Sequence, residues 1–157
     1  MNTSIGIKNE NLAKVAEKLV ETLADEFVLY TKTKKAHWNI EGQDFYNKHL
    51  FFEAQYQQLD GIIDTIAERI RTLGHYAPAT LREYLSLTHL SEHHLESNDS
   101  ITYIKTLLSD HESILIHLRE NIENFAVEFR DAGTSDFITG LLEIHEKMAW
   151  MLRSHLK

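Results

Sequence analysis

Five of the side chains between residues 37 and 68 of the sequence have types and positions that suit a metal site. They are His37, His49, Glu53, Asp64 and Glu68. The last four form two pairs whose members are four residues apart. On a helix this spacing places both members of a pair on one face, one turn apart, so each pair can hold one ion. Because the chain has no cysteine, any metal site here must use nitrogen and oxygen ligands.

Four long helices are expected to position these side chains. One proline and six glycines in 157 residues argue against β-structure, and apolar residues recur at alternating steps of four and three, which is typical of amphipathic helices. The predicted helices span residues 8–37, 45–73, 99–131 and 135–156, with Thr134 as the N-cap of the last.

The connection between the second and third helices is unusually long, about 25 residues. A short helix beginning at Thr80 is expected within it. We therefore predict an all-α fold: a ferritin-like four-helix bundle with a short extra helix in the long crossover between helices two and three. Nothing in the sequence marks a boundary, so residues 1–157 are expected to form a single domain.

The two ligand pairs cannot meet within one chain. On a single helix they are separated by roughly 22 Å, whereas a metal–ligand bond is about 2 Å long. With His49 placed at zero, the other three ligands fall within about 100° of it around the helix, away from the apolar stripe near 240–340°. The ligand face is therefore expected to point out of the bundle.

Two copies of this helix that cross antiparallel near residues 58–59 would join the pairs. His49 and Glu53 of one copy would meet Glu68 and Asp64 of the other, and the two-fold axis would create two equal sites. An intrachain site of the ordinary di-iron type needs Glu-x-x-His motifs on inward helix faces. No glutamate here is followed three residues later by a histidine, so the spacing favours a site between subunits.

Several stretches resemble the Dps family, the mini-ferritins also called DNA-binding proteins from starved cells. They are AHWNIEG at 36–42 with a second histidine at 49, DTIAER at 64–69, and GLLEIHEKMAWML at 140–152, and the resemblance covers nearly the whole chain. It implies a hollow homododecamer of two-fold dimers that oxidises Fe(II) with hydrogen peroxide or dioxygen. Such a shell stores ferric mineral and protects the cell against oxidative damage. The ferroxidase ligands it implies are His37, His49 and Glu53 of one subunit, with Asp64 and Glu68 of its partner.

The resemblance assigns roles to further residues. Glu53 stands where many members have aspartate, so it would bind a second iron or act through a water. Trp38 corresponds to a tryptophan beside the iron site that would scavenge one-electron oxidants, although it could simply pack, as we expect of Trp150. Asp131 and Asp136 would line an acidic pore for Fe(II); alternatively, they are ordinary helix-end charges.

Plainer interpretations stand beside these. Asp64 and Glu68 could form a solvated acidic patch paired with Arg69 and Arg71, and the other ligand pair could be an ordinary surface pair. The remaining histidines are expected to have structural or solvent-facing positions. His111 and His145 lie on apolar stripes and should be hydrogen-bonded in the core. The crossover histidines should face solvent; they are His89, His93 and His94.

Charge and composition limit the partners. Twenty-four acidic against sixteen basic residues give a net charge of −8, which repels nucleic acid. Residues 1–14 carry only Lys8 and Lys14 as basic groups, so DNA binding should be weak or absent. No apolar run is long enough for a membrane span, and no signal layout is present; a cytoplasmic protein is expected. The alternatives are a non-enzymatic nucleoid protein that coats DNA and a metal-buffering bundle without redox turnover.

Overall fold

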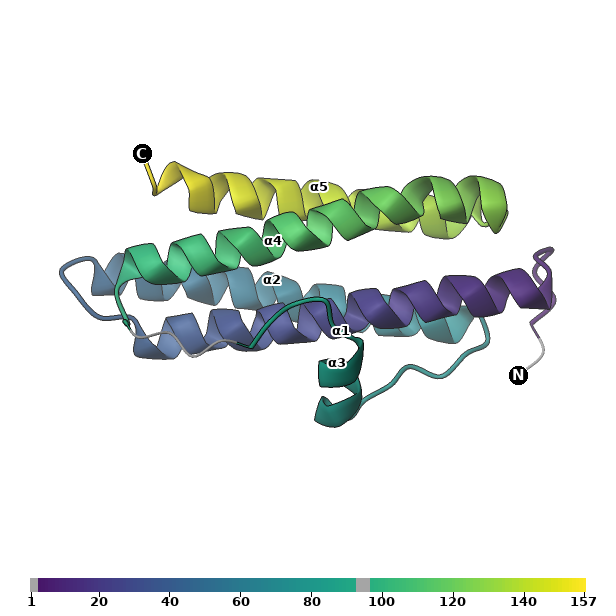
Figure 1. The fold of residues 1–157 in the computed structure, drawn as a ribbon, viewed down its shortest axis with the longest axis horizontal. Helices are drawn as coiled ribbons and strands as arrows, with labels where there is room; N and C mark the ends of the chain where they lie inside the picture. The colour runs from purple at the N-terminus through teal and green to yellow at the C-terminus, as the bar shows by residue number, and fades with distance from the viewer. Residues whose placement is uncertain (1–2, 93–96) are drawn as a thin grey trace.

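Four long helices lie side by side in the computed structural model, which describes residues 3–92 and 97–157 (Figure 1). They are α1 (Asn9–Asn39), α2 (Phe45–Thr72), α4 (Ser100–Glu123) and α5 (Ala132–Ser154). α1 packs chiefly on α2, and α4 on α5. The part of the chain that the structure describes contains no strand. The predicted all-α bundle is confirmed.

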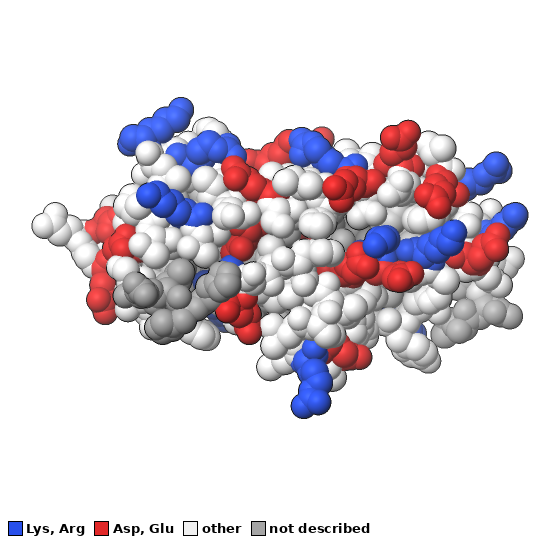
Figure 2. All heavy atoms as spheres, viewed as in Figure 1, with Lys and Arg blue, Asp and Glu red and all other residues white. Residues whose placement is uncertain are grey.

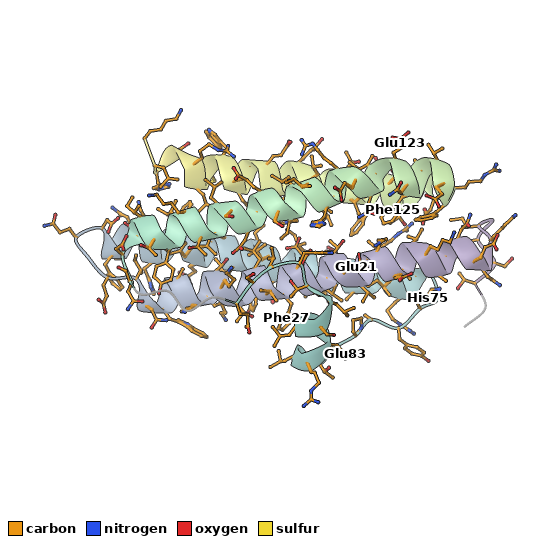
Figure 3. All side chains as sticks on the ribbon, viewed as in Figure 1. Glu21, Phe27, His75, Glu83, Glu123 and Phe125 are labelled. Atoms are coloured by element: carbon orange, nitrogen blue, oxygen red, sulfur yellow. The ribbon has the colours of Figure 1, made fainter. Side chains whose placement is uncertain are left out.

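The crossover between α2 and α4 carries the expected short helix, α3 (Leu81–Leu87). Thr80 begins it with a capping box: its hydroxyl accepts a hydrogen bond from the Glu83 backbone N–H, and the Glu83 carboxylate accepts one from the Thr80 N–H. Tyr84 is buried and its ring stacks on Phe27 of α1 at 4.4 Å. Figure 3 labels Phe27 on α1 and Glu83 on α3. These contacts fix the crossover against the outer side of α1.

The junction of the last two long helices differs from the prediction. α4 ends at Glu123 and continues as one π-helical turn, Asn124–Glu128. Arg130 then adopts a left-handed conformation with φ 57°. The N-cap of α5 is Asp131, not Thr134, because the Asp131 carboxylate accepts a hydrogen bond from the Thr134 backbone N–H at 2.9 Å. The last helix therefore starts three residues before the predicted position.

Apolar side chains from all four long helices fill the space between them, and many are fully buried. Examples are Leu19, Leu29, Phe52, Ile66, Ile104 and Ile138. The members of each helix's stripe recur at steps of three and four, as the sequence predicts. Within the described residues, no helix is both long and apolar enough to cross a membrane.

Candidate metal centre

His37 and His49 face each other where the C-terminal end of α1 meets the start of α2. Their rings stack with centroids 3.8 Å apart and planes inclined at 22°. Nδ1 of His37 donates a hydrogen bond to the backbone carbonyl of His49, and Nδ1 of His49 donates one to the carbonyl of His37, both at 2.8 Å.

These reciprocal bonds decide which ring nitrogens can bind a metal. A carbonyl oxygen only accepts hydrogen bonds, so each Nδ1 must carry the proton and each Nε2 keeps its lone pair in the neutral ring. Metal-binding histidines commonly have their second nitrogen fixed in this way, which sets the tautomer and the ring orientation. His37 and His49 therefore present two oriented donor atoms before any metal arrives.

The other three predicted ligands lie on α2, at two different levels. Glu53 is half-buried one turn after His49, and its Oε1 lies 3.5 Å from Nε2 of Gln57. Asp64 and Glu68 are exposed near the far end of the same helix. Because α2 runs unbroken from Phe45 to Thr72, His49 and Glu53 are far from Asp64 and Glu68 within one chain, as the sequence predicted. Across residues 3–92 and 97–157, no three histidine or acidic side chains converge closely enough to hold a metal ion.

Asp64 and Glu68 do not form the acidic patch with arginine partners that the sequence allowed. The Arg69 guanidinium donates to the Thr134 hydroxyl at 2.8 Å and pairs with Asp131 at 3.3 Å. Arg71 donates to a backbone carbonyl and lies over the ring of Tyr76. Both arginines are thus occupied elsewhere, and neither carboxylate has a hydrogen bond or ion pair to a described residue.

Comparisons with known proteins identify the family. A model of the ferritin-like domain matches residues 16–157. The chain is 35% identical to DNA protection during starvation protein 2 of Bacillus anthracis, over 91% of this chain and 97% of that protein. The crystal structure of a Dps protein from Vibrio cholerae O1 superposes with a TM-score of 0.92 at 34% identity, covering 100% of this chain and 98% of that one. The chain belongs to the Dps branch of the ferritin-like family.

An uncharacterized low temperature-induced protein of Nostoc sp. is also similar, at 40% identity over 98% of this chain and 86% of that protein. The Vibrio protein is described as a member of the ferritin-like diiron-carboxylate superfamily. The imidazoles of His37 and His49 lie at one end of α2, and the carboxylates of Asp64 and Glu68 lie near the other end. The assignment of the five ligands to one shared centre stays a prediction.

Trp38 extends from α1 into solvent and is 67% exposed. This exposure does not fit a packing role within the protomer. Nζ of Lys34 lies 5.5 Å from the centre of the Trp38 ring and 4.7 Å from that of Tyr56. The Tyr56 ring in turn meets the His37 ring edge-on, at 5.2 Å. The Tyr56 ring therefore contacts the histidine pair, while oxidant scavenging by Trp38 stays a prediction.

The two aspartates predicted to line a pore have different surroundings. Asp136 is exposed on the first turns of α5. Asp131 is only 3% exposed, and its carboxylate caps α5 and pairs with Arg69, which is the helix-end role. The lining of a pore by these two aspartates stays a prediction. Trp150, which was expected to pack, is 61% exposed in the protomer.

His111 and His145 are buried in the core, as predicted. Their Nδ1 atoms are 2.9 Å apart, and Nε2 of His145 lies 2.7 Å from Oε1 of Glu26, at a charge-pairing distance but without hydrogen-bond alignment. All three side chains are fully buried. Sequence reasoning missed Glu26. It follows Leu23 by three residues and so falls on the apolar stripe of α1, which is the signal that identifies it.

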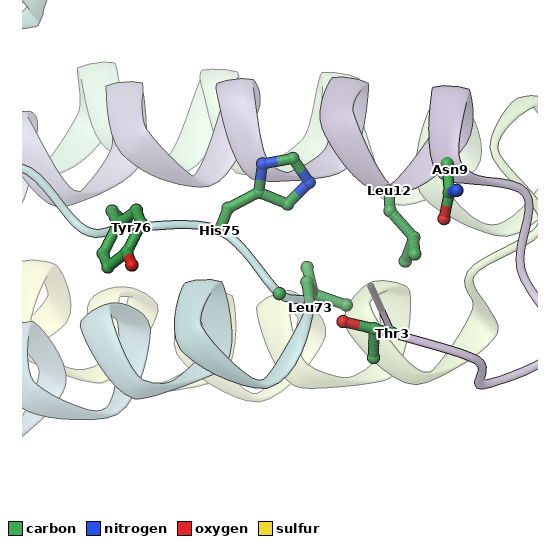
Figure 4. A pocket seen from close by; sticks show the side chains of 7 residues that line it. Thr3, Asn9, Leu12, Leu73, His75 and Tyr76 are labelled. Carbon is green, nitrogen blue, oxygen red and sulfur yellow. The ribbon is translucent and has the colours of Figure 1, made fainter. Parts of the chain in front are cut away.

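A pocket of about 340 Å³ lies at the other end of α1, between the N-terminal segment and the end of α2 (Figure 4). Leu12 and Leu73 form its apolar wall, and Thr3, His75 and Tyr76 are among the other residues that line it. Because α1 and α2 run antiparallel, this pocket is far from His37. Its lining does not bring several charged groups together, so it is not the metal centre.

Proposed function

We propose that this protein is a ferroxidase whose site is completed between two protomers, in a hollow dodecamer that stores ferric mineral. The observation that supports this most directly is the pair formed by His37 and His49, with both Nδ1 atoms tied to carbonyls and both Nε2 atoms available. The partner would supply the missing oxygen ligands through Asp64 and Glu68. Iron is then the substrate of the site as well as its cargo.

The outer face of α2 suits an antiparallel crossing of two copies near residues 58–59. Gly61 lies in the interior of α2, where glycine costs about 1 kcal/mol relative to alanine. A Cβ atom there would meet nothing within 4 Å in the protomer, so contacts within the chain do not explain it. Close packing of a second helix against this position would explain the glycine. Leu50, beside His49, is 43% exposed and would be covered in the same contact.

The chemistry follows from the ligand types. The two imidazoles bind Fe(II), and the carboxylates favour the harder Fe(III) that forms. Two Fe(II) ions give up one electron each, and one hydrogen peroxide accepts both; its O–O bond breaks and two protons complete two waters. Because one peroxide takes both electrons from a pair of Fe(II) ions, the one-electron reduction that would release a hydroxyl radical is avoided.

Complementation between two inactive variants tests whether the site is shared. In a mixed dimer of a His37→Ala protomer and an Asp64→Ala protomer, one site receives both substitutions and the other receives none. Random mixing makes half the dimers mixed, so about a quarter of the sites should be intact. Fe(II) oxidation with stoichiometric peroxide, followed after co-expression, should recover to about a quarter of the wild-type initial rate.

The matched control is a chain that carries both substitutions. Mixed with wild-type chains in equal amounts, it gives mixed dimers in which each site lacks one ligand, so only pure wild-type dimers stay active. Particle mass, measured in parallel, checks that every variant still assembles. Failure of the two single variants to complement each other in normal particles would refute the shared site, because a site within one chain cannot be rebuilt by mixing.

We propose that binding of DNA contributes little. The relatives named for DNA protection make it the natural alternative, but this chain has a net charge of −8. On the face shown in Figure 2, lysine and arginine side chains alternate with acidic ones and form no continuous basic strip. A gel-shift titration with duplex DNA should show no complex at physiological salt. A stable complex there would favour the coating function.

A further inference from the structure

A second histidine pair lies outside the candidate iron site, where the crossover meets α1 and α4. His89 follows α3 directly, and its Nδ1 donates a hydrogen bond to Oδ2 of Asp25 at 3.0 Å. The Asp25 carboxylate also accepts from the His89 backbone N–H at 2.6 Å and from the Thr88 hydroxyl at 2.7 Å. Asp25 is 2% exposed, so this carboxylate is fixed in place by three donors.

The hydrogen bond to Asp25 determines what the His89 ring offers to solvent. An ionised carboxylate only accepts, so Nδ1 carries the proton and Nε2 carries the lone pair. A carboxylate behind an imidazole also raises its basicity as a metal ligand. The His89 side chain is 38% exposed, so an ion can reach it.

His117 of α4 supplies the second ring. It is half-buried and stacks on His89, with centroids 4.0 Å apart and planes inclined at 21°. Among the described residues, no group hydrogen-bonds its ring nitrogens; the Asn121 side-chain amide donates to its backbone carbonyl. A pocket of about 440 Å³ opens beside His89, lined in part by Ser91, Ser109 and Ser113, and leaves room for water.

This arrangement repeats that of His37 and His49. In both places two rings from different segments stack at about 4 Å, and an acceptor behind an Nδ1 leaves an Nε2 available. The core pair of His111 and His145 differs, since its rings are tilted by 52°, hydrogen-bonded to each other and fully buried. His93 and His94, the other crossover histidines, lie outside the described residues.

We propose that His89 and His117 form a second metal site, for a borderline divalent transition-metal ion such as Zn²⁺. Two imidazole nitrogens bind the ion, and waters from the adjacent pocket complete its coordination. Asp25 is a positioning residue that holds the His89 ring from behind. A bound ion would link the crossover to α4. The proposal does not depend on iron oxidation.

Zinc chloride alone is the probe. In crystals of the assembled protein grown with zinc, the anomalous difference map should show a peak about 2.0–2.1 Å from Nε2 of His89 and from a ring nitrogen of His117. In solution, His117→Ala should bind one Zn²⁺ fewer per chain than the wild type. Asp25→Asn should retain the site with affinity reduced about 10–100-fold.

The matched control is His155→Ala, which removes another surface histidine whose Nδ1 is bonded within its own helix. It should leave the zinc count unchanged. His89→Ala, a change at an exposed side chain, repeats the test if Asp25→Asn does not fold. The absence of a peak between His89 and His117, or an unchanged zinc count in both alanine variants of this pair, would overturn the proposal.

Discussion

His111 should make the protein lose stability in mild acid. Burial lowers the pKa of His111 well below its ordinary value of 6.5, and the charge of His145 lowers it further. Below pH 6.5 the unfolded chain therefore binds a proton at this position that the folded chain does not. The stability that this residue confers is present above pH 6.5 and is lost as the pH falls toward the folded pKa.

The magnitude follows from one proton. Each pH unit below 6.5 lowers the free energy of unfolding by about 1.4 kcal/mol, so a fall to about pH 5 costs roughly 2 kcal/mol. His111→Asn removes this titration and places an amide oxygen near the position of Nδ1, where it can accept from His145. The variant will be less stable at neutral pH because of the cavity, but its stability should fall less steeply with acid.

Denaturant unfolding at about pH 7.5 and about pH 5 measures the difference. Subunit concentration must be held constant because association adds to apparent stability. Between the two pH values the wild type should lose roughly 2 kcal/mol more than His111→Asn. Leu115→Ala, which leaves a cavity one turn away without removing a titrating group, should parallel the wild type. If His111→Asn loses as much as the wild type, the folded protein does protonate His111 and the reasoning is wrong.

Three further predictions concern the helix ends and the outer face of α2. Arg130→Gly should raise stability by about 0.5–1 kcal/mol, because it relieves left-handed strain of about 1–2 kcal/mol at the entropic cost of a glycine; a lower melting temperature would contradict this. Asp131→Ala removes the N-cap of α5 and the partner of Arg69, and should lower stability by about 1–3 kcal/mol, seen by calorimetry as a fall in melting temperature. Gly61→Leu should leave the helical content unchanged by circular dichroism and reduce particle mass by light scattering, whereas a full-size particle would show that α2 does not pack there.

Much of the fold could be predicted because the bundle repeats one simple pattern. Steps of three and four along each helix determine which residues face inward, and Thr80 with Glu83 forms a capping box that is visible in the sequence. The junction at Asn124–Glu128 could not be predicted in this way. A π turn inserts an extra residue per turn without changing residue types, and both Asp131 and Thr134 are good N-cap residues. What distinguishes them is the folded backbone, in which the Asp131 carboxylate accepts a hydrogen bond from the Thr134 N–H.

The candidate site, like the fold, could be predicted only in part. Spacing on one helix was enough to separate His49 from Asp64, since helix rise is nearly constant. What spacing could not show is the stacking of His37 on His49, which depends on how α1 and α2 pack across the turn between them. Asp25 and Glu26 were missed for a similar reason. Neighbouring residues on a helix differ by about 100°, so one carboxylate reaches outward to His89 and the other inward to His145.

The two halves of the proposed iron site are prepared to different degrees. His37 and His49 hold each other through two hydrogen bonds, so their orientation costs little further entropy when iron binds. Asp64 and Glu68 are exposed and must be ordered by whatever contacts them. If the site is shared, the entropic cost of binding comes mainly from ordering these carboxylates. Packing of a second α2 against Gly61 would order them in part before the ion arrives. Assembly and iron affinity would then be linked through the carboxylates more than through the histidines.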